Sequence, residues 1–535
     1  MTTAVVLRGG PERTVRPIVA PVTAVVGFFG VWCLVALAFS STAIVPYPWT
    51  LVSQIVADWN LIAINTASTM RVAASGLVAA VAVMAPLACL CLVLPVSEPI
   101  IMRVALVIHV IPFVAIAPIL LVSLPTDMSR TVIAALQVYF PLLVGLLLGL
   151  RSADAASLDV VTASGGRNLA RLRHVRAASA VPQLVAGLQI AVPAAVLGAV
   201  ISEFFGADRG LGAIIVTAQQ SFLIDRTWAI AIFIGALAAV GYGIVTLLAR
   251  VLVPWAGQGA GVGTQIAGTE TSPLRPIPSL VAGIVSVILL VGFWQSLRSV
   301  FGLPAFFTRT PGEIWTFLFA GNPLSGAPAV KFWEEFGRGL SQTLLDAAVG
   351  FITGTTIAIA VAILFVAAPP IGRAFMPVAV VLRSVPLLAL TPLLMLMFGR
   401  GLLGVTVLVT LVTFFPTLVT VMTGLKTVPA GAIDVVRASG GSTLQTALLV
   451  RLQYALPSIT AAARIAVPNA LGGALLSEWL ATGKGIGQML TRASITADYY
   501  TLWAAGVLVV IVALVAYAVI GWLDGFVQRR LGIAV

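Results

Sequence analysis

The sequence predicts an all-α integral membrane protein made of two similar halves, and three observations support this. Of the 535 residues, 60% are hydrophobic and 9% are charged, and the mean hydropathy is +1.10, so polar surface is too scarce to cover a water-soluble globule. Apolar stretches of the ~20 residues that cross a bilayer recur along the whole chain. The stretch from Asp159 to Gly212 returns 275 positions later, with 24 of its 54 positions identical. We therefore expect two repeats.

Twelve apolar stretches give the expected membrane spans, six in each half. They lie near 18–39, 73–94, 101–123, 131–150, 183–202 and 228–251, and again near 278–297, 345–367, 374–397, 403–424, 458–477 and 503–523. An even number per half means that both copies enter the membrane from the same side, so the repeats are parallel. We expect a first repeat over 1–253, a flexible linker over 254–277 and a second repeat over 278–535.

Arginine and lysine indicate the orientation. They gather before the first span, in the loop after the fourth span of each half, and after the last span. The positive-inside rule then places both termini and both loops in the cytoplasm. The same rule accounts for the net charge of +12, so nucleic acid is not an expected partner. Two histidines and three cysteines without C-x-x-C spacing give no reason to expect a metal site.

The repeated loop after the fourth span has a helical pattern. In its first copy apolar residues recur at intervals of three and four on both sides of Gly165-Gly166, at Leu158, Val161, Leu169, Leu172 and Val175. We expect two short helices that meet at this break. A loop that only connected spans would need about four residues. We therefore expect a folded loop to bind a partner on the cytoplasmic side. The alternative is that the loop was duplicated with its domain and has no further role.

This loop resembles the EAA loop of binding-protein-dependent ABC importer permeases, whose pattern is Glu-Ala-Ala, three residues, Gly, nine residues, then Ile-x-Leu-Pro. Asp159 stands at the Glu position, with Gly165 and Val175 at the Gly and Ile positions. Valine pairs replace the alanine pair, and a later proline is kept as Pro182 and Pro457. The resemblance implies that contacts to an ATPase involve Asp159, Ala163, Ser164, Gly165, Gly166 and Val175, and in the second copy Asp434, Ala438, Ser439, Gly440, Gly441 and Val450.

More of the chain resembles the sulfonate, taurine, nitrate and pyrimidine-precursor subgroup of these permeases. The segment from Arg383 to Leu393 is similar to its third-span signature, and His109-Val110-Ile111-Pro112 with Pro118 is the first-half counterpart. Glu203 and Glu478, each followed by a Gly-x-Gly passage, resemble the acidic residue that ends its fifth span. The resemblance covers roughly residues 45–253 and 300–530.

The resemblance implies a fold similar to the type I permeases of ABC importers, with two permease domains fused in one chain. In that family, two ATP-binding cassette subunits drive a central path to open alternately to each side, and an extracytoplasmic solute-binding protein delivers a small solute. The resemblance also implies a multi-pass protein of the bacterial plasma (inner) membrane. The chain contains no G-x-x-x-x-G-K-[ST] motif. ATP and Mg²⁺ are therefore expected on the partner, and this chain is expected to hold no cofactor and to be no enzyme.

Ionisable and helix-breaking residues within the spans are the candidates for the translocation path. His109 and Arg383 each precede a proline by three residues, and ionisable side chains at membrane depth are costly. Arg383 would attract an anion, so an anionic solute is slightly favoured. Prolines in spans free backbone carbonyls for a polar path, and they stand at Pro112, Pro118, Pro386 and Pro392. Alternatively, the two ionisable side chains snorkel to the cytoplasmic surface and the prolines only shape packing.

Two alternatives stay open at this point. Glu203 and Glu478, at the outer ends of the fifth spans, either dock a cationic patch of a solute-binding protein or accept hydrogen bonds from nearby loop amides. The whole chain is either an ABC importer permease or an ion-coupled secondary transporter, which also commonly has twelve spans in two parallel halves. The spans contain no acidic relay beyond Asp346, and a secondary transporter has no use for a duplicated docking loop, so the permease is favoured.

Overall fold

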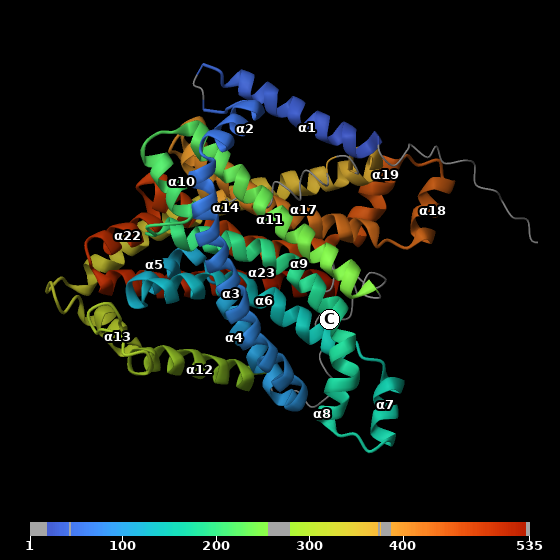
Figure 1. The fold of residues 1–535 in the computed structure, drawn as a ribbon, viewed down its shortest axis with the longest axis horizontal. Helices are drawn as coiled ribbons and strands as arrows, with labels where there is room; N and C mark the ends of the chain where they lie inside the picture. Colours follow the sequence, from blue (N-terminus) through green and yellow to red (C-terminus); the bar gives the residue numbers. More distant parts are fainter. Residues whose placement is uncertain (1–18, 42–43, 255–278, 373–374, 376–386, 531–535) are drawn as a thin grey trace, which may run out of the picture.

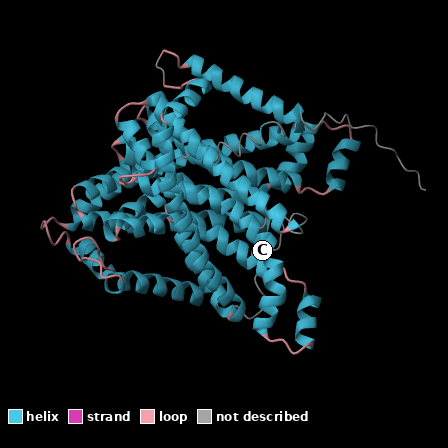
Figure 2. Ribbon diagram, viewed as in Figure 1, coloured by secondary structure: helices cyan, strands magenta, loops and turns pink. Residues whose placement is uncertain are grey.

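The computed structural model describes residues 19–41, 44–254, 279–372, 375 and 387–530, and its regular elements are helices. Figure 2 shows them in cyan, with no strand among the described residues. The all-α membrane fold expected from the sequence is therefore confirmed. All of the expected linker except Pro254 lies outside the described residues, as do the path candidates Arg383 and Pro386.

The helices of the two halves follow one another in a similar order (Figure 1). The first half contains α1 (Val19–Ala38), α2 (Pro48–Ala57), α3 (Trp59–Val93), η1 (Pro95–Ser97), α4 (Glu98–Val110), α5 (Phe113–Ser123), α6 (Thr126–Arg151), α7 (Ala155–Ala163), α8 (Asn168–Arg171), η2 (Leu172–Arg176), α9 (Ala177–Phe204), α10 (Leu211–Gln220) and α11 (Ile224–Leu252). The second half contains α12 (Ser279–Val300), α13 (Pro311–Ala320), α14 (Ala329–Ala367), α16 (Leu387–Phe398), α17 (Leu402–Lys426), α18 (Ala430–Ala438), α19 (Thr443–Thr446), η5 (Ala447–Arg451), α20 (Leu452–Tyr454), α21 (Leu456–Ser477), η6 (Glu478–Thr482), α22 (Gly485–Ile495) and α23 (Tyr499–Arg530).

Nine helices in the described ranges are long and apolar enough to cross a membrane, and the bent pair α4 and α5 would make a tenth. The expected number of twelve is not confirmed. The expected span 101–123 is the bent pair, and the first part of the expected span 374–397 lies outside the described residues. The segment Val26–Ala38 of α1 counts only as a shorter apolar helix.

The expected third span of the first half is broken at Ile111-Pro112. Its two helices meet at an angle of 95°. Ile111 is extended, with φ −63° and ψ 123°, because the ring of a proline disfavours the α conformation in the residue before it. Pro112 then stands directly before α5. The expected span near 101–123 is therefore two helices joined at a proline.

Small residues bring the long helices of each half into close contact. The helices α3, α6 and α9 pack together, and α14, α17 and α21 pack in the same way. Gly76 of α3 lies so close to Ala134 of α6 that a Cβ atom would overlap it, and Gly350 of α14 lies equally close to Val409 of α17. Inside a bilayer, helices associate through such close van der Waals fit, because lipid tails are as apolar as the side chains.

The two halves interlock through their third-span helices. The helix α5 packs against α21, α22 and α23 of the second half, α16 packs against α10 and α11 of the first, and α12 lies along α4. Figure 1 shows α5, in cyan, beside the red helices α22 and α23. Leu390 of α16 contacts the core clusters of both halves. The boundary between the halves is therefore built from the third-span segments.

A pair of tryptophans fastens the first long helix of each half to the last one. Trp32 lies 6.5 Å from Trp228, and Trp294 lies 5.7 Å from Trp503 between ring centroids. Each indole N–H donates to a backbone carbonyl of the connection after the first helix, at Pro46, Ile44, Arg309 and Phe307 respectively. Trp228 and Trp503 lie at the start of the sixth spans. Each pair therefore holds the first and the last long helix of its half together.

We expect Trp503→Phe to lower the melting temperature of the purified protein by a few degrees. The change removes the N–H that donates 3.0 Å to the carbonyl oxygen of Phe307, and an unpaired buried polar group costs about 1–3 kcal/mol. Thermal unfolding in detergent measures the effect. Trp522→Phe is the control, because Trp522 is 64% exposed on the surface of α23. Equal melting temperatures for the two variants would contradict the proposed role of the pair.

Candidate functional site

Two protruding loops with the same backbone stand at one end of the molecule. We call residues 159–176 the first knuckle and residues 434–451 the second knuckle. Figure 1 shows α7 and α8 and, apart from them, α18 and α19, toward the end at which α23 finishes, whereas α10, α13 and α22 lie toward the other end. The two knuckles thus share one side, as expected from the sequence. Which side of the membrane this is stays a prediction.

Glycines at the tip of each knuckle produce its sharp turn. Gly165 has a φ of +79° and Gly440 a φ of +78°, a left-handed conformation that costs glycine little. The N–H of Gly166 donates to the carbonyl oxygen of Val161 at 2.8 Å, and the N–H of Gly441 donates to that of Val436 at 2.9 Å. This bonding ends the helices α7 and α18 in a Schellman motif. The expected helix-glycine-helix element is confirmed in both copies.

Different side chains hold the two turns in shape. In the first knuckle the Arg171 Nε–H donates to the Thr162 hydroxyl at 2.8 Å and joins its two helices. In the second, Ser442 and Gln445 form a capping box at the start of α19. Arg451 donates to the carbonyl oxygen of Leu425 at 2.9 Å and ties the second knuckle to α17. Burial, with a smaller effect from the charge of Arg437, lowers the pKa of Arg451.

The residues predicted to contact an ATPase lie along these turns. Most of them are exposed, namely Asp159, Ala163, Ser164, Gly165, Asp434, Ala438, Ser439 and Gly440, whereas Gly166, Gly441, Val175 and Val450 are partly buried. The two valines belong to the π-helical turns η2 and η5, which the sequence did not predict. Their contact with an ATPase stays a prediction.

Each knuckle also presents a pair of exposed apolar side chains. They are Val160 and Leu169 in the first, with 66% and 75% of their surface exposed, and Val435 and Leu444 in the second, with 67% and 52%. The two pairs occupy equivalent positions in the repeats. Apolar side chains at the tip of a protruding loop are a typical contact surface for another protein. Of these four residues, only Leu169 belongs to the helical pattern that the sequence shows.

The described path candidates lie around the bend between α4 and α5. His109 is in the last turn of α4, and its ring stacks on Phe140 with centroids 4.3 Å apart. Pro112 stands at the bend, and Pro118 is buried inside α5. Pro392 lies inside α16, on the other side of the boundary between the halves. The structure therefore places these residues in the third-span segments, and their part in a translocation path stays a prediction.

A buried carboxyl group holds the end of the fifth span in each half. Glu203 and Glu478 are each 1% exposed. The Oε2 atom of Glu203 accepts hydrogen bonds from the Thr69 hydroxyl at 2.8 Å and the Gly212 N–H at 3.0 Å. The Oε2 atom of Glu478 accepts from the Thr343 hydroxyl at 2.9 Å and the Gly487 N–H at 2.8 Å. The structure thus contains bonds from backbone amides, although these amides lie in the first turns of α10 and α22 and not in a loop.

The threonines complete each of these two carboxyl clamps. The Thr69 hydroxyl accepts the Leu211 N–H at 2.9 Å, and the Thr343 hydroxyl accepts the Ile486 N–H at 3.0 Å. Each clamp therefore joins α3 or α14 to the first turn of α10 or α22. Neither threonine could be predicted from the sequence, because each lies more than 130 positions from its glutamate and hydroxyl residues in spans are common.

Aromatic rings connect the halves beside the clamps. Phe205 and Trp479 each follow a clamp glutamate closely in the sequence, and their rings meet edge to face with centroids 5.2 Å apart. Phe113, at the start of α5, lies 6.3 Å from Phe205. Such edge-to-face pairs are a favoured aromatic geometry. The Phe205–Trp479 contact therefore joins the ends of the two fifth spans.

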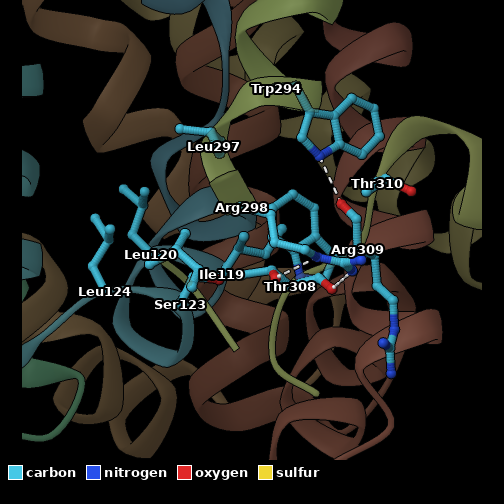
Figure 3. Close-up of a pocket in the computed structure, with 12 residues that line it drawn as sticks. Ile119, Leu120, Ser123, Leu124, Trp294, Leu297, Arg298, Thr308, Arg309 and Thr310 are labelled. Atoms are coloured by element: carbon cyan, nitrogen blue, oxygen red, sulfur yellow. Dashed lines mark hydrogen bonds between the residues drawn. The ribbon is translucent and has the colours of Figure 1, made fainter. Parts of the chain in front are cut away.

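Figure 3 shows a small cavity at the boundary between the halves, lined by α5, α12, α23 and the segment 303–310. Its volume is about 50 Å³, enough for a few water molecules but not for a metabolite. The Trp294 indole donates to the Arg309 carbonyl at its rim, and the Arg309 guanidinium turns away from the cavity to lie 3.9 Å from the centroid of the Tyr500 ring. Among the described residues no cluster of His, Cys, Asp and Glu could hold a metal ion.

Comparison with known proteins agrees with this geometry. The family model described as "Binding-protein-dependent transport system inner membrane component" matches the chain twice, over residues 95–258 and 350–533. The chain is similar to a probable ABC transporter permease protein of Haemophilus influenzae, with 28% identity over 45% of this chain and 93% of the relative. It is also similar to a riboflavin transport system permease protein of Chloroflexus aurantiacus (27% identity, 46% and 88% covered) and to a taurine transport system permease protein of Escherichia coli (25%, 41% and 78%). Each relative matches about half of this chain.

Proposed function

This chain belongs to the family of binding-protein-dependent transport system inner membrane components, with two such domains fused in one chain, and from that premise we propose that it forms the complete translocation path of an ABC importer. Its two knuckles would couple the path to two separate ATP-binding cassette subunits. The observation that carries this proposal is the duplicated knuckle, with the same Schellman turn and the same exposed apolar pair in both copies.

The same proposal assigns the remaining partners. A solute-binding protein would deliver a small solute to the end that bears α10 and α22. ATP and Mg²⁺ would be bound and used only by the cassette subunits. The knuckles and both termini would lie in the cytoplasm, and the membrane would be the inner membrane of a bacterium. The repeats would run over 1–253 and 278–535, joined by residues 254–277. Arg383 supports an anionic solute on sequence grounds alone.

The packing of the helices supports coupling through both knuckles. Each fifth span continues from a knuckle, and the third-span segments of each half pack against the other half. A force applied to one knuckle therefore reaches both sides of the boundary, because packed helices move as rigid elements. Closure of the ATPase pair would move the knuckles together and separate the Phe205 and Trp479 rings at the other end.

Uptake by reconstituted vesicles tests the proposal against the secondary transporter. The chain is reconstituted with the cassette subunits and the solute-binding protein that co-purify with it from its native membrane. We expect accumulation of the solute only when ATP and Mg²⁺ are supplied on the knuckle side, and none with cassette subunits that cannot hydrolyse ATP. Uptake driven by a proton gradient with no cassette subunit present would reject the proposal.

A further inference from the structure

The two knuckles share one backbone but differ in the side chains that flank their tips. Arg173 and His174 in the first knuckle correspond to Leu448 and Leu449 in the second. The two leucines are 44% and 59% exposed, and Arg173 and His174 are exposed as well. The same positions thus face outward in both copies and carry opposite chemistry, cationic in one and apolar in the other.

The difference extends over the whole knuckle. The first contains four arginines against one aspartate, a net charge of +3, and the second contains two arginines against one aspartate, a net charge of +1. Arg167, at the tip, corresponds to Ser442. Neither Arg167 nor Arg173 forms an ion pair within the described part of the chain, so both charges are available to a partner.

The position of these charges favours a protein partner over the membrane surface. Residues 168–176 continue into α9 as one long helix. At 1.5 Å per residue, the ten steps from Ala177 back to Arg167 place Arg167 about 15 Å before the start of α9. Figure 1 shows α7 and α8 projecting past the end of the helical bundle. The helix over residues 168–204 has 37 residues, or about 55 Å at 1.5 Å per residue, which exceeds the ~40–45 Å of a bilayer with its headgroups. Arg167 precedes this helix and lies two positions before the exposed Leu169.

We propose that the two knuckles dock on unlike surfaces, the first in an acidic socket and the second in an apolar one, and that the two ATPase subunits are therefore different proteins. This inference rests on the proposed function. The apolar pair common to both knuckles would fill the same kind of pocket, and the flanking residues would select the subunit. Opposite charges across an interface raise the association rate and exclude the wrong partner, whereas an apolar rim is indifferent to charge.

Site-specific cross-linking with the full chain tests the inference. Cys33, Cys89 and Cys91 are replaced by alanine, and a single cysteine is introduced as Ser164→Cys or Ser439→Cys, two equivalent exposed positions. The probes are the cassette subunits that co-purify with the chain from its native membrane, each alone and then together. We expect each knuckle to cross-link preferentially to a different subunit. Between about 0.05 and 0.5 M NaCl, the Ser164→Cys yield should fall at least about fivefold and the Ser439→Cys yield less than about twofold.

Exchange of the flanking residues provides the matched variants. Arg173→Leu with His174→Leu should remove the salt dependence of the first knuckle, and Leu448→Arg with Leu449→His should confer it on the second. Cross-linking of both knuckles to one kind of subunit with equal salt dependence would overturn the inference and leave the proposed function standing. No cross-link at either knuckle would overturn both. If the exchange changes only binding to phosphatidylglycerol vesicles, the arginines serve the membrane and the inference is wrong.

Discussion

We expect the Gly485→Ala variant to give much less folded protein than the unchanged chain. Gly485 has a φ of +82°, a conformation that costs an alanine about 1–3 kcal/mol. A Cβ atom at this position would also overlap the carboxyl group of Glu478. The carboxyl group must then move away from the Thr343 hydroxyl and the Gly487 N–H, and each buried polar group left unpaired costs about 1–3 kcal/mol more. The sum of several kcal/mol approaches the whole stability of many proteins.

The yield of monodisperse protein after extraction, together with its melting temperature, measures this effect. Gly472→Ala is the matched control in the neighbouring helix α21, because no atom lies within 4 Å of the added Cβ. The double variant Glu478→Ala with Gly485→Ala removes the overlap, so its loss should be smaller than the sum of the two single losses. A Gly485→Ala protein as stable as the Gly472→Ala control would show that the clamp geometry is not needed.

The corresponding clamp of the first half should behave in the same way. Gly210 has a φ of +128°, and its Cβ would overlap the carboxyl group of Glu203. The N–H of Gly210 also donates to the Asn65 side chain at 2.7 Å. The position equivalent to Asn65 in the second half is Gly339, which has no side chain to accept such a bond. The two halves thus reach one geometry with partly different side chains. What both copies keep is the glutamate, the threonine and the Gly-x-Gly passage.

Features that depend on neighbouring residues could be predicted from the sequence. The knuckle followed from the Gly165-Gly166 pair between short apolar repeats, because a left-handed glycine ends a helix locally. The positions of most spans followed from hydropathy, because a helix in a bilayer must satisfy its own backbone bonds. The exposed pair Val160 and Leu169 could also have been predicted, because the pattern of the short helices indicates which side chains face outward.

Features that depend on distant residues could not be predicted. The Thr69 partner of Glu203 is one of several hydroxyl residues in its span, and nothing local marks it. The sequence does not show whether a proline breaks its span, because Pro112 does so whereas Pro86 and Pro141 lie inside the continuous helices α3 and α6. The outcome depends on whether neighbouring helices support a bend. The packing of α5 against the second half likewise follows from the assembled bundle.

Gly440→Pro is expected to abolish ATP-driven uptake while the bundle stays folded. A proline fixes φ near −65°, whereas Gly440 has a φ of +78°. Proline also removes the N–H that donates to the Arg437 carbonyl oxygen at 3.0 Å. The turn between α18 and α19 must therefore open, and Val435 and Leu444 no longer form one surface. Because the second knuckle protrudes from the bundle, the melting temperature should change by only a few degrees.

Two readouts separate loss of binding from loss of coupling in this variant. Cross-linking through Ser439→Cys reports contact with the cassette subunit, and the rate of ATP hydrolysis in the presence of the solute-binding protein reports coupling. We expect Gly440→Pro to lower both at least tenfold. Gly431→Ala is the control, because position 431 corresponds to Ala156 in the first half and has no atom within 4 Å of an added Cβ.

A variant of the first knuckle tests whether ATPase contacts at both knuckles are required for uptake. If the two knuckles transmit force to a shared boundary between the halves, Gly165→Pro alone should stop uptake as completely as Gly440→Pro, although each leaves the other knuckle intact. A rigid pair of interlocked halves cannot open when only one side is pulled, since α5 and α16 each pack against the opposite half. Full ATP-driven uptake by either single variant would therefore contradict coupling through that knuckle, and a half rate in each would show that the halves work independently.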